Sequence, residues 1–335
     1  MTGAPANPRV SVAVCTYNGE KFVAEQMRSI LTQTLLPGEV VVSDDGSTDR
    51  SVEIVLDTVK AWQSANPAAR VDLHVLRNEA PSGVTKNFEK ALMACRGDLI
   101  ALCDQDDVWH PDRLESSVAV FDGRPDVLLL HSDAQLIDDG GHPTGEYLLS
   151  ALGVSTAEIE AVRSGRALDV LLRRNIVTGA TTMVRKELVQ RARPFPAAWV
   201  HDEWLGAVAA STGRLEIVER PLIGYRQHSG NQIGAGRVTL AGKLERVRTG
   251  RTARNARLLE RARVLRDRSA SFDPVPDSET LGKIQGKLAH EMMRSGLPEP
   301  RLARMRPVVA AWLSRSYNRY GLGVQDVVRD LLQPV

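Results

Sequence analysis

The 335-residue sequence is short of cysteine, of aromatic residues and of long hydrophobic runs. Its three cysteines, Cys15, Cys95 and Cys103, lie inside apolar segments. This is typical of reduced core residues and argues against a disulfide framework or a metal site built on thiolates. No apolar run approaches the roughly 20 residues of a membrane span, and residues 1–9 lack the apolar core of a signal peptide. We therefore expect a cytoplasmic protein.

Acidic residues are scarce toward the C-terminus. The whole chain has a net charge of +2, but from Arg237 onward 20 Lys and Arg stand against 10 Asp and Glu, which leaves 23 against 31 before that point. This basic region, residues 237–335, predicts either a solvated charged face on a small helical bundle or peripheral contact with anionic lipid at the inner face of the cell membrane. Aromatic residues make up only 4% of the chain and do not alternate with the basic ones, which argues against a nucleic-acid partner.

The rest of the composition is that of an ordinary globular protein, with 43% hydrophobic and 25% charged residues and enough length for about two domains. Apolar, β-branched runs alternate with stretches that carry apolar residues at helical spacing. The runs are residues 10–16, 39–43, 71–76 and 99–103. Such alternation predicts a mostly parallel, open α/β sheet covered by helices. We expect this α/β domain in residues 1–235 and a basic helical appendage in residues 236–335.

The pattern is less regular between residues 116 and 235. Residues 127–131 and 215–218 predict strands. Residues 175–184 predict a further strand with a bend marked by glycine. Residues 147–166 are poorly patterned, and we expect a mobile loop there.

The most informative stretch is Asp104-Gln105-Asp106-Asp107, which directly follows the apolar run 99–103. In an open α/β sheet, ligands bind beyond the carboxyl ends of the strands. Three carboxylates in four residues repel one another unless a cation or strong donors lie between them. A cluster of oxygen ligands suits Mg²⁺ or Mn²⁺, whose usual partner is a phosphate. The alternative is an acidic turn before a helix that Pro111 and Asp112 open.

Two earlier strand ends also carry polar or aromatic side chains. In the turn Asp44-Asp45-Gly46-Ser47, either Ser47 or Asp49 caps the next helix, or Asp45 accepts a hydrogen bond from a nucleobase or ribose. Tyr17 is either a loop aromatic packed on the core or a platform on which a base stacks. The residues alone leave both alternatives open.

Several motifs follow one another in order. They are Cys15-Thr16-Tyr17-Asn18, Asp44-Asp45-Gly46-Ser47-Thr48-Asp49, Ser82-Gly83-Val84-Thr85-Lys86-Asn87, Asp104-Gln105-Asp106-Asp107 and Trp109-His110-Pro111-Asp112-Arg113-Leu114. Together they resemble glycosyltransferase family 2, with the GT-A fold, over about residues 9–235. The resemblance implies a nucleotide-diphosphate sugar donor, a divalent cation and an inverting transfer to a hydroxyl acceptor. It also implies that residues 9–115 bind the donor and residues 116–235 face the acceptor.

Two motifs narrow the resemblance. Asp-Gln-Asp-Asp-Val-Trp and Tyr225-Arg226-Gln227-His228 are similar to those of the rhamnosyltransferase-like branch. This implies a dTDP- or UDP-sugar donor, with a deoxysugar such as rhamnose as the leading expectation. The implied acceptor is a glycan, such as a cell-surface polysaccharide, or a lipid-linked molecule.

The resemblance also assigns donor-binding residues by their place in the motifs. It implies that Thr16, Tyr17 and Asn18 line the donor pocket, with Tyr17 at the base, and that Asp45 binds the base or the ribose. Lys86 occupies a place where the family often has arginine, and would help to hold the nucleotide.

The same resemblance implies a metal site. Asp104 and Asp106 would form the DxD pair, with Asp106 the direct metal ligand and Asp107 supporting it. The implied ion, Mn²⁺ or Mg²⁺, bridges both phosphates and neutralises the charge that builds on the leaving diphosphate.

A second chemical site is expected at the start of a helix near residue 202. Asp202 could simply cap that helix, but an inverting transfer needs a base for the acceptor hydroxyl, and the resemblance places that base at Asp202. Many relatives have an acidic residue just before the base, where this chain has His201, so Glu203 is the reserve candidate. Further along, Arg226 is expected as a cation for the phosphates and His228 as a metal or diphosphate contact.

Two other classes of protein remain open. A catalytically silent nucleotide-sugar-binding or scaffold protein could keep the same fold, although the intact Asp106 and Asp202 argue against it. A sugar nucleotidyltransferase would need a glycine-rich, basic loop after the first strand, and residues 17–20 do not form one.

Overall fold

The computed structural model of the protein describes residues 10–228 and 251–334, which pack as two compact units. In the described residues, the first unit consists of residues 10–155, 177–209 and 213–228, and the second of residues 156–176, 210–212 and 251–334. The domain boundary expected at residues 235 and 236 lies outside the described residues.

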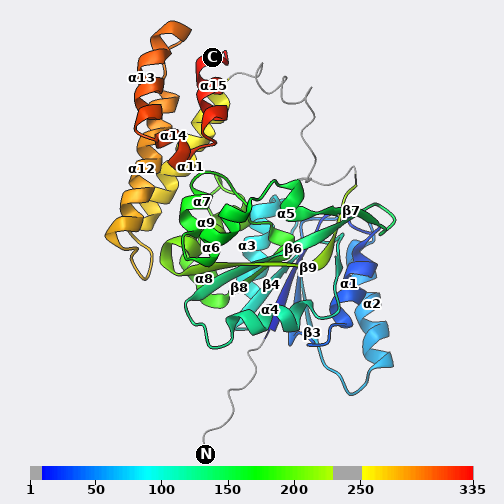
Figure 1. Ribbon diagram of the computed structural model, residues 1–335. Coiled ribbons are helices and arrows are strands. Elements are labelled where there is room, and N and C mark those ends of the chain that lie inside the picture. The colour runs from blue at the N-terminus through cyan, green and yellow to red at the C-terminus, as the bar shows by residue number, and fades with distance from the viewer. Residues whose placement is uncertain (1–9, 229–250, 335) are drawn as a thin grey trace, which may run out of the picture. The chain divides into compact units, whose positions relative to one another are not determined.

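One sheet forms the centre of the first unit (Figure 1). Its strands are β1 (Val10–Thr16), β2 (Glu39–Asp44), β3 (Asp72–Arg77), β4 (Leu99–Cys103), β5 (Val108–Trp109), β6 (Val127–Ile137), β7 (Pro143–Tyr147), β8 (Thr182–Arg185) and β9 (Arg214–Arg226). They follow the order β3-β2-β1-β4-β8-β6-β9-β5, with β7 paired to β6. The first four strands are parallel, whereas β8 runs antiparallel to both of its neighbours. The expected α/β class is confirmed.

Helices cover both faces of this sheet (Figure 1). The helices with residues in the first unit are α1 (Val23–Leu31), α2 (Ser51–Ala65), α3 (Val84–Ala94), α4 (Arg113–Phe121), α5 (Leu148–Ala151), α8 (Lys186–Ala192) and α9 (His201–Thr212), with a 3₁₀ turn, η1, at Gly179–Thr181. Because parallel crossovers are right-handed, α1 and α2 lie on one face and α3 lies on the other.

The direction of the chain reverses between β1 and β4. From β1 the chain moves outward to β2 and β3, and then returns through α3 to place β4 on the other side of β1. Val14 is in register with Cys103, so the loops that follow both strands leave the sheet next to each other. A reversal of this kind opens a crevice at the carboxyl ends of the strands, which is where ligands bind in open α/β sheets.

The central strands β1 and β4 match their predicted bounds because most of their residues are apolar or β-branched. Every residue of β1 and β4 is buried, as expected for parallel strands covered on both faces. Val12, Val14, Leu99 and Ala101 belong to one continuous core. These strands therefore form a rigid base beneath the loops at their ends.

The described part of residues 116–235 corrects several expectations. Residues 147–166 contain α5 and α6 (Thr156–Arg163) rather than a structureless loop. Of residues 175–184, only those in β8 form a strand, after the η1 turn. The strand expected at 127–131 continues to Ile137, because β6 and β9 keep pairing through several register shifts. Tertiary pairing here overrides the local sequence pattern.

The second unit is helical. Its helices are α6, α7 (Ala167–Leu171), α11 (Arg251–Ser269), α12 (Ser278–Ser295), α13 (Arg301–Leu313), α14 (Ser316–Tyr320) and α15 (Val324–Leu332). Within residues 10–228 and 251–334, no helix combines the length and the hydrophobicity needed to cross a bilayer.

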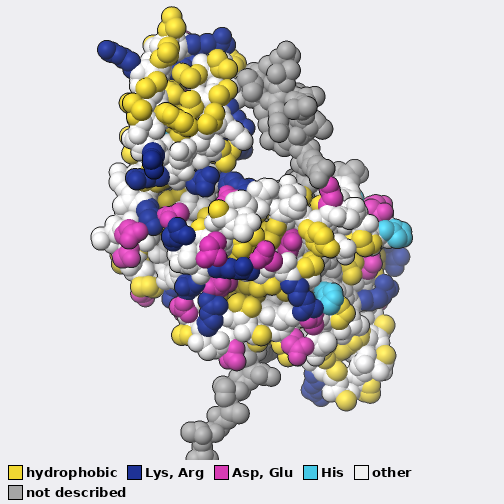
Figure 2. Space-filling view, in the orientation of Figure 1, with side chains coloured by type: hydrophobic (Ala, Val, Ile, Leu, Met, Phe, Trp, Pro, Cys, Tyr) yellow, Lys and Arg dark blue, Asp and Glu magenta, His cyan; other side chains and the backbone are white. Residues whose placement is uncertain are grey.

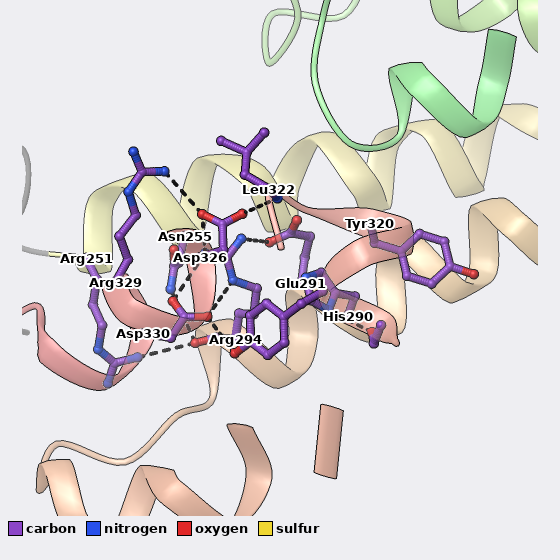
Figure 3. A network of polar contacts seen from close by, with 12 residues as sticks. Arg251, Asn255, His290, Glu291, Arg294, Tyr320, Leu322, Asp326, Arg329 and Asp330 are labelled. Atoms are coloured by element: carbon purple, nitrogen blue, oxygen red, sulfur yellow. Dashed lines mark hydrogen bonds and ion pairs between the residues drawn. The ribbon is translucent and has the colours of Figure 1, made fainter. Parts of the chain in front are cut away.

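A network of charged side chains fills the centre of this helical unit (Figure 3). The guanidinium of Arg294 lies 2.7 Å from Asp330, 3.4 Å from Asp326 and 3.6 Å from Glu291, and all four side chains are buried. The hydroxyl of Tyr317 donates to Asp330 at 2.8 Å. Buried charges are tolerated when they are paired in this way, although removal of one partner is expensive.

Candidate functional site

The three aspartates after β4 occupy different environments. Asp107 is fully buried, and one of its oxygens accepts a hydrogen bond from the backbone N–H of Arg226 at 2.9 Å. A carboxylate oxygen of Asp106 lies 2.8 Å from Nε2 of His228, which packs against the ring of Phe22. Asp104 is partly exposed at the end of the strand. The end of β9 therefore meets the carboxylate cluster directly.

Arg226 fixes this loop in place. Its side chain is only 1% exposed. Its Nε donates to the carbonyl of Asp106 at 2.7 Å, one terminal nitrogen donates to the Glu25 carboxylate at 2.6 Å, and the other donates to the carbonyl of Asp139 at 3.0 Å. The geometry thus gives Arg226 a positioning role. Its expected contact with the donor phosphates stays a prediction.

The cluster carries an excess of negative charge. Although the residue is partly exposed, loss of solvent around its carboxylate and the charges of Asp106 and Asp202 raise the pKa of Asp104 to about 7. Burial and the charges of Asp106 and Asp104 also raise the pKa of Asp107 well above its usual range. Asp202 is hydrogen-bonded to Gly179 of η1, and η1 packs against β4, so the two expected chemical sites lie near each other although they come from distant parts of the chain.

Two residues near the aspartates were not singled out from the sequence. The pKa of Tyr225 is raised by burial and then by the charges of Asp104, Asp107, Asp106 and Asp202, so this phenol lies among the carboxylates. Arg113 is buried beneath them, where it stacks on a tryptophan ring and donates to the Leu102 carbonyl. Burial lowers its pKa to about 10. Both residues belong to motifs of the resemblance, which was the only signal available for them.

The donor set fits a cation that arrives together with a phosphate ligand. No group of three or more His, Cys, Asp or Glu side chains forms a metal site among residues 10–228 and 251–334. Asp106 and His228 nevertheless supply an oxygen and a nitrogen, and the raised pKa of Asp104 shows that a positive charge would be favoured beside it. Mg²⁺ commonly takes only one or two carboxylates from the protein, because phosphates and water complete its shell.

The loop after β1 is tied to the carboxylate loop. The side-chain amide of Gln105 accepts from the Tyr17 N–H at 2.8 Å and donates to the Tyr17 carbonyl at 3.1 Å. The side chain of Tyr17 itself is 42% exposed. Asn18 adopts a left-handed conformation, with φ of 49°, and its side chain accepts from the Thr48 N–H at 2.9 Å. The backbone of Tyr17 is therefore held by hydrogen bonds, while its side chain is accessible to a ligand.

Polar groups at the end of β2 hold the neighbouring loops. The hydroxyl of Thr16 is buried and donates to Asp44 at 2.8 Å, so it stabilises the strand ends. Asp45 accepts from Asn78 at 2.7 Å, from the backbone and hydroxyl of Ser82 at 2.8 Å each, and from the Gly83 N–H at 2.9 Å. Burial acts to raise the pKa of Asp45, but these hydrogen bonds outweigh it and lower the pKa. Asp45 therefore orders the loop before α3, and its expected contact with the base or ribose stays a prediction.

Asp202 lies in the first turn of α9. Its carboxylate accepts from the Gly179 N–H at 2.9 Å. The ring of the preceding His201 stacks on Phe88, with the centroids 4.0 Å apart, and burial lowers its pKa to about 3. Glu203 follows on the same helix and is partly buried. The neutral His201 ring therefore packs beside the carboxylate that was expected to act as the base.

Lys86 lies apart from the contacts described above. Its ammonium group pairs with Glu89 at 2.6 Å and donates to the Phe195 carbonyl at 3.1 Å. It lines a shallow hollow of about 470 Å³ together with Glu89, Lys90, Met93, Arg193 and Pro194. No contact in the described residues joins Lys86 to the three aspartates, and its nucleotide contact stays a prediction.

Comparison with known families supports the resemblance seen in the sequence. The family model "Glycosyl transferase family 2" matches residues 11–150. The dTDP-rhamnosyl transferase RfbG of Shigella flexneri is 25% identical over 248 residues, which cover 66% of this chain and 74% of that protein. The uncharacterized protein Rv1520 of Mycobacterium tuberculosis is 25% identical over 66% of this chain. The chain spans 59% of the length of that relative.

Solved structures share the fold. Residues 1–349 of TarS from S. aureus, in complex with UDP-GlcNAc, align with a TM-score of 0.59 and 17% identity over 96% of this chain and 89% of that one. The mannosyltransferase PcManGT from Pyrobaculum calidifontis, in complex with GDP-Man and Mn²⁺, aligns with a TM-score of 0.51 and 19% identity, over 93% of this chain and 76% of that one. At these identities the likeness concerns the fold.

Proposed function

Residues 11–150 belong to glycosyltransferase family 2, and on this basis we propose that the protein is a metal-dependent, inverting glycosyltransferase. It transfers a sugar from a nucleotide-diphosphate donor to a hydroxyl group of its acceptor. The observation that carries the proposal is that Asp104 and Asp106 follow the carboxyl end of β4, while Asp202, from α9, is hydrogen-bonded to η1, which packs against β4. An acidic cation site and a separate carboxylate are the two groups that this reaction needs.

The chain's own residues divide the work of the reaction. Asp106, with His228 and Asp104 beside it, would hold a divalent cation. When bound, that cation neutralises charge on the departing diphosphate. Arg226 keeps the Asp106 backbone in position. Asp202 accepts the proton from the acceptor hydroxyl as its oxygen attacks the anomeric carbon from the face opposite the diphosphate.

The donor is proposed to be a dTDP- or UDP-sugar, with rhamnose as the leading sugar. The relative from Shigella flexneri supports rhamnose by its name, and TarS was solved with UDP-GlcNAc. Tyr17 lies exposed beside the crevice, where its ring can stack on the base. Thr16, Asn18 and Asp45 order the surrounding loops and complete the proposed donor site.

The acceptor is proposed to be a glycan or a lipid-linked molecule used in building a cell-surface polysaccharide. Mn²⁺ or Mg²⁺ is the proposed cation, because the ligands are mostly hard oxygen donors, and PcManGT was solved with Mn²⁺. The proposed peripheral contact with the membrane lies in residues 237–335, of which 237–250 fall outside the described residues.

The division of roles can be tested with two isosteric variants. Asp106→Asn should abolish Mn²⁺-dependent binding of a nucleotide sugar, measured by isothermal titration calorimetry with a panel of dTDP- and UDP-sugars. Asp202→Asn should keep that binding and lose turnover by about a thousandfold or more, because only the proton transfer is removed. Equal losses of donor binding in both variants would contradict the assignment.

A further inference from the structure

The second unit exposes an unusual share of hydrophobic side chains. Ten of the thirteen large hydrophobic side chains that are exposed in the described parts of the chain lie in residues 251–334. On a soluble surface such side chains are normally scattered, whereas a contiguous group marks an interaction site. Figure 2 shows hydrophobic side chains gathered over the part of this unit where α13 and α15 lie, with Lys and Arg at the edges of the group.

Most of this surface comes from one stripe along α13. Leu302 and Leu313 are 84% and 76% exposed, and Met305, Val309 and Trp312 are exposed between them. At 100° per residue these five positions fall within a sector about 100° wide. The buried residues of α13, Arg304 and Val308, lie outside this sector. α15 adds a second exposed row made of Val324, Val328 and Leu332.

The same unit buries charge in its interior. The side chains of Arg251, Arg294, Arg304, Asp326 and Asp330 are almost fully buried. Arg294 pairs with Asp326 and Asp330 (Figure 3), while Arg251 and Arg304 donate to backbone carbonyls. A small helical bundle in water gains most stability from the reverse arrangement, with leucines inside and arginines outside. The outward leucines on α13 are therefore explained best by an apolar medium outside the unit.

The charged residues of the second unit indicate which kind of partner fits the hydrophobic face of α13 and α15. Residues 251–334 contain 16 Lys and Arg against 9 Asp and Glu. Arg301 and Arg306 flank the stripe of α13 on its two sides. A second copy of this chain docked on the same face would bring these arginines together, and like charges at an interface oppose binding. Anionic lipid headgroups complement them, while the acyl chains accept the leucines.

We infer that α13 and α15 dock in the headgroup layer of an anionic bilayer. The stripe of α13 lies parallel to the membrane plane, because the helix has 13 residues and carries arginines at both edges. Trp312 belongs to the stripe, as is common for tryptophan at the border between headgroups and acyl chains. This inference is independent of the transfer reaction, because it concerns only the surface of the second unit.

Vesicle flotation of the full-length protein tests the inference. The protein should float with vesicles that contain 30% phosphatidylglycerol and stay behind with pure phosphatidylcholine. The double variant Leu302→Ser/Leu313→Ser should partition about a hundredfold more weakly, at roughly tenfold for each leucine that leaves the interface. The matched variant Leu56→Ser/Val275→Ser removes two exposed side chains outside α13 and α15 and should float like the wild type.

A spectroscopic measurement gives a second readout. The tryptophan emission of the protein should shift to shorter wavelength with anionic vesicles, and this shift should disappear in Trp312→Phe. Equal flotation of the wild type and the leucine variant, or equal flotation with both vesicle types, would overturn the inference. The inference would also be overturned if neither protein bound vesicles and light scattering showed that the wild type is an oligomer and the leucine variant a monomer. Calorimetric donor binding, measured without lipid, reports on the transfer function separately.

Discussion

The buried imidazole of His201 should make the first unit sensitive to mild acid. Burial lowers its pKa to about 3 in the folded protein, whereas an unfolded histidine has a pKa near 6.5. Above pH 6.5 the ring is neutral in both states and has no effect on the pH dependence. As the pH falls below 6.5, the unfolded state takes up a proton that the folded state cannot accept, so folding becomes less favourable.

The size of this effect follows from the two pKa values. Each pH unit between them is worth 1.36 kcal/mol, so His201 should remove about 2 kcal/mol of unfolding free energy between pH 7.5 and pH 5.0. His201→Leu replaces the ring with an apolar side chain that does not titrate. The variant should therefore lose about 2 kcal/mol less than the wild type over this range, whatever its stability at pH 7.5.

Urea unfolding at pH 7.5, 6.5 and 5.0, followed by the fluorescence of the buried Trp204 and Trp109, measures the difference. His131 is also buried, and its pKa is lowered to about 4. It contributes equally to the pH dependence of the wild type and of His201→Leu, so its effect cancels in the comparison. An unchanged pH slope in His201→Leu would show that the ring is protonated or solvated in the folded state, and would refute the reasoning.

Three further substitutions test contacts that stabilise each unit internally. Arg226→Lys keeps the charge but loses the forked contacts, so it should cost about 2–3 kcal/mol of unfolding free energy and weaken Mn²⁺ binding in calorimetry, whereas Arg50→Lys at an exposed ion pair should do neither. Asp45→Asn should cost about 2 kcal/mol at pH 7. Because the folded pKa of Asp45 is lowered, the carboxylate stabilises the fold above about pH 4, and this stabilisation is lost as the pH falls through the folded pKa. If the free energy of unfolding of Asp45→Asn fell with acid as steeply as that of the wild type, this role of Asp45 would be refuted. Arg294→Met should destabilise the second unit by about 3–5 kcal/mol in urea unfolding. Lys283→Met removes a more exposed ion pair and serves as the control. If Arg294→Met lost no more unfolding free energy than this control, the stabilising role of the network in Figure 3 would be contradicted.

Local sequence pattern was sufficient for the central strands and for several helices. The bounds of β1 and β4 follow from runs made mostly of apolar and β-branched residues, as is usual for strands buried on both faces. The described part of the helical appendage expected in residues 236–335 is likewise helical, from α11 to α15. Because the ends of these strands could be predicted, the edge of the sheet at which a ligand is expected could be predicted as well, whereas the order of the strands could not.

Contacts between distant segments could not be anticipated in the same way. Arg226 contacts the Asp106 carbonyl and Glu25, which lie 120 and 201 residues away in sequence, and its expected contact with phosphates stays a prediction. No local pattern predicts that pairing. α5 and α6 were missed because they have four and eight residues, too few to display a helical period. The roles of Tyr225 and Arg113 depend on burial, which only the assembled sheet determines.

The double hydrogen bond between Gln105 and the Tyr17 backbone has a mechanical consequence. Both bonds join the backbone that carries Tyr17 to the loop that carries the aspartates, so they fix the spacing between the two loops. In the proposed donor site, a donor of matching length would contact both loops at once. The spacing between Tyr17 and the aspartates would therefore select for the length of the donor.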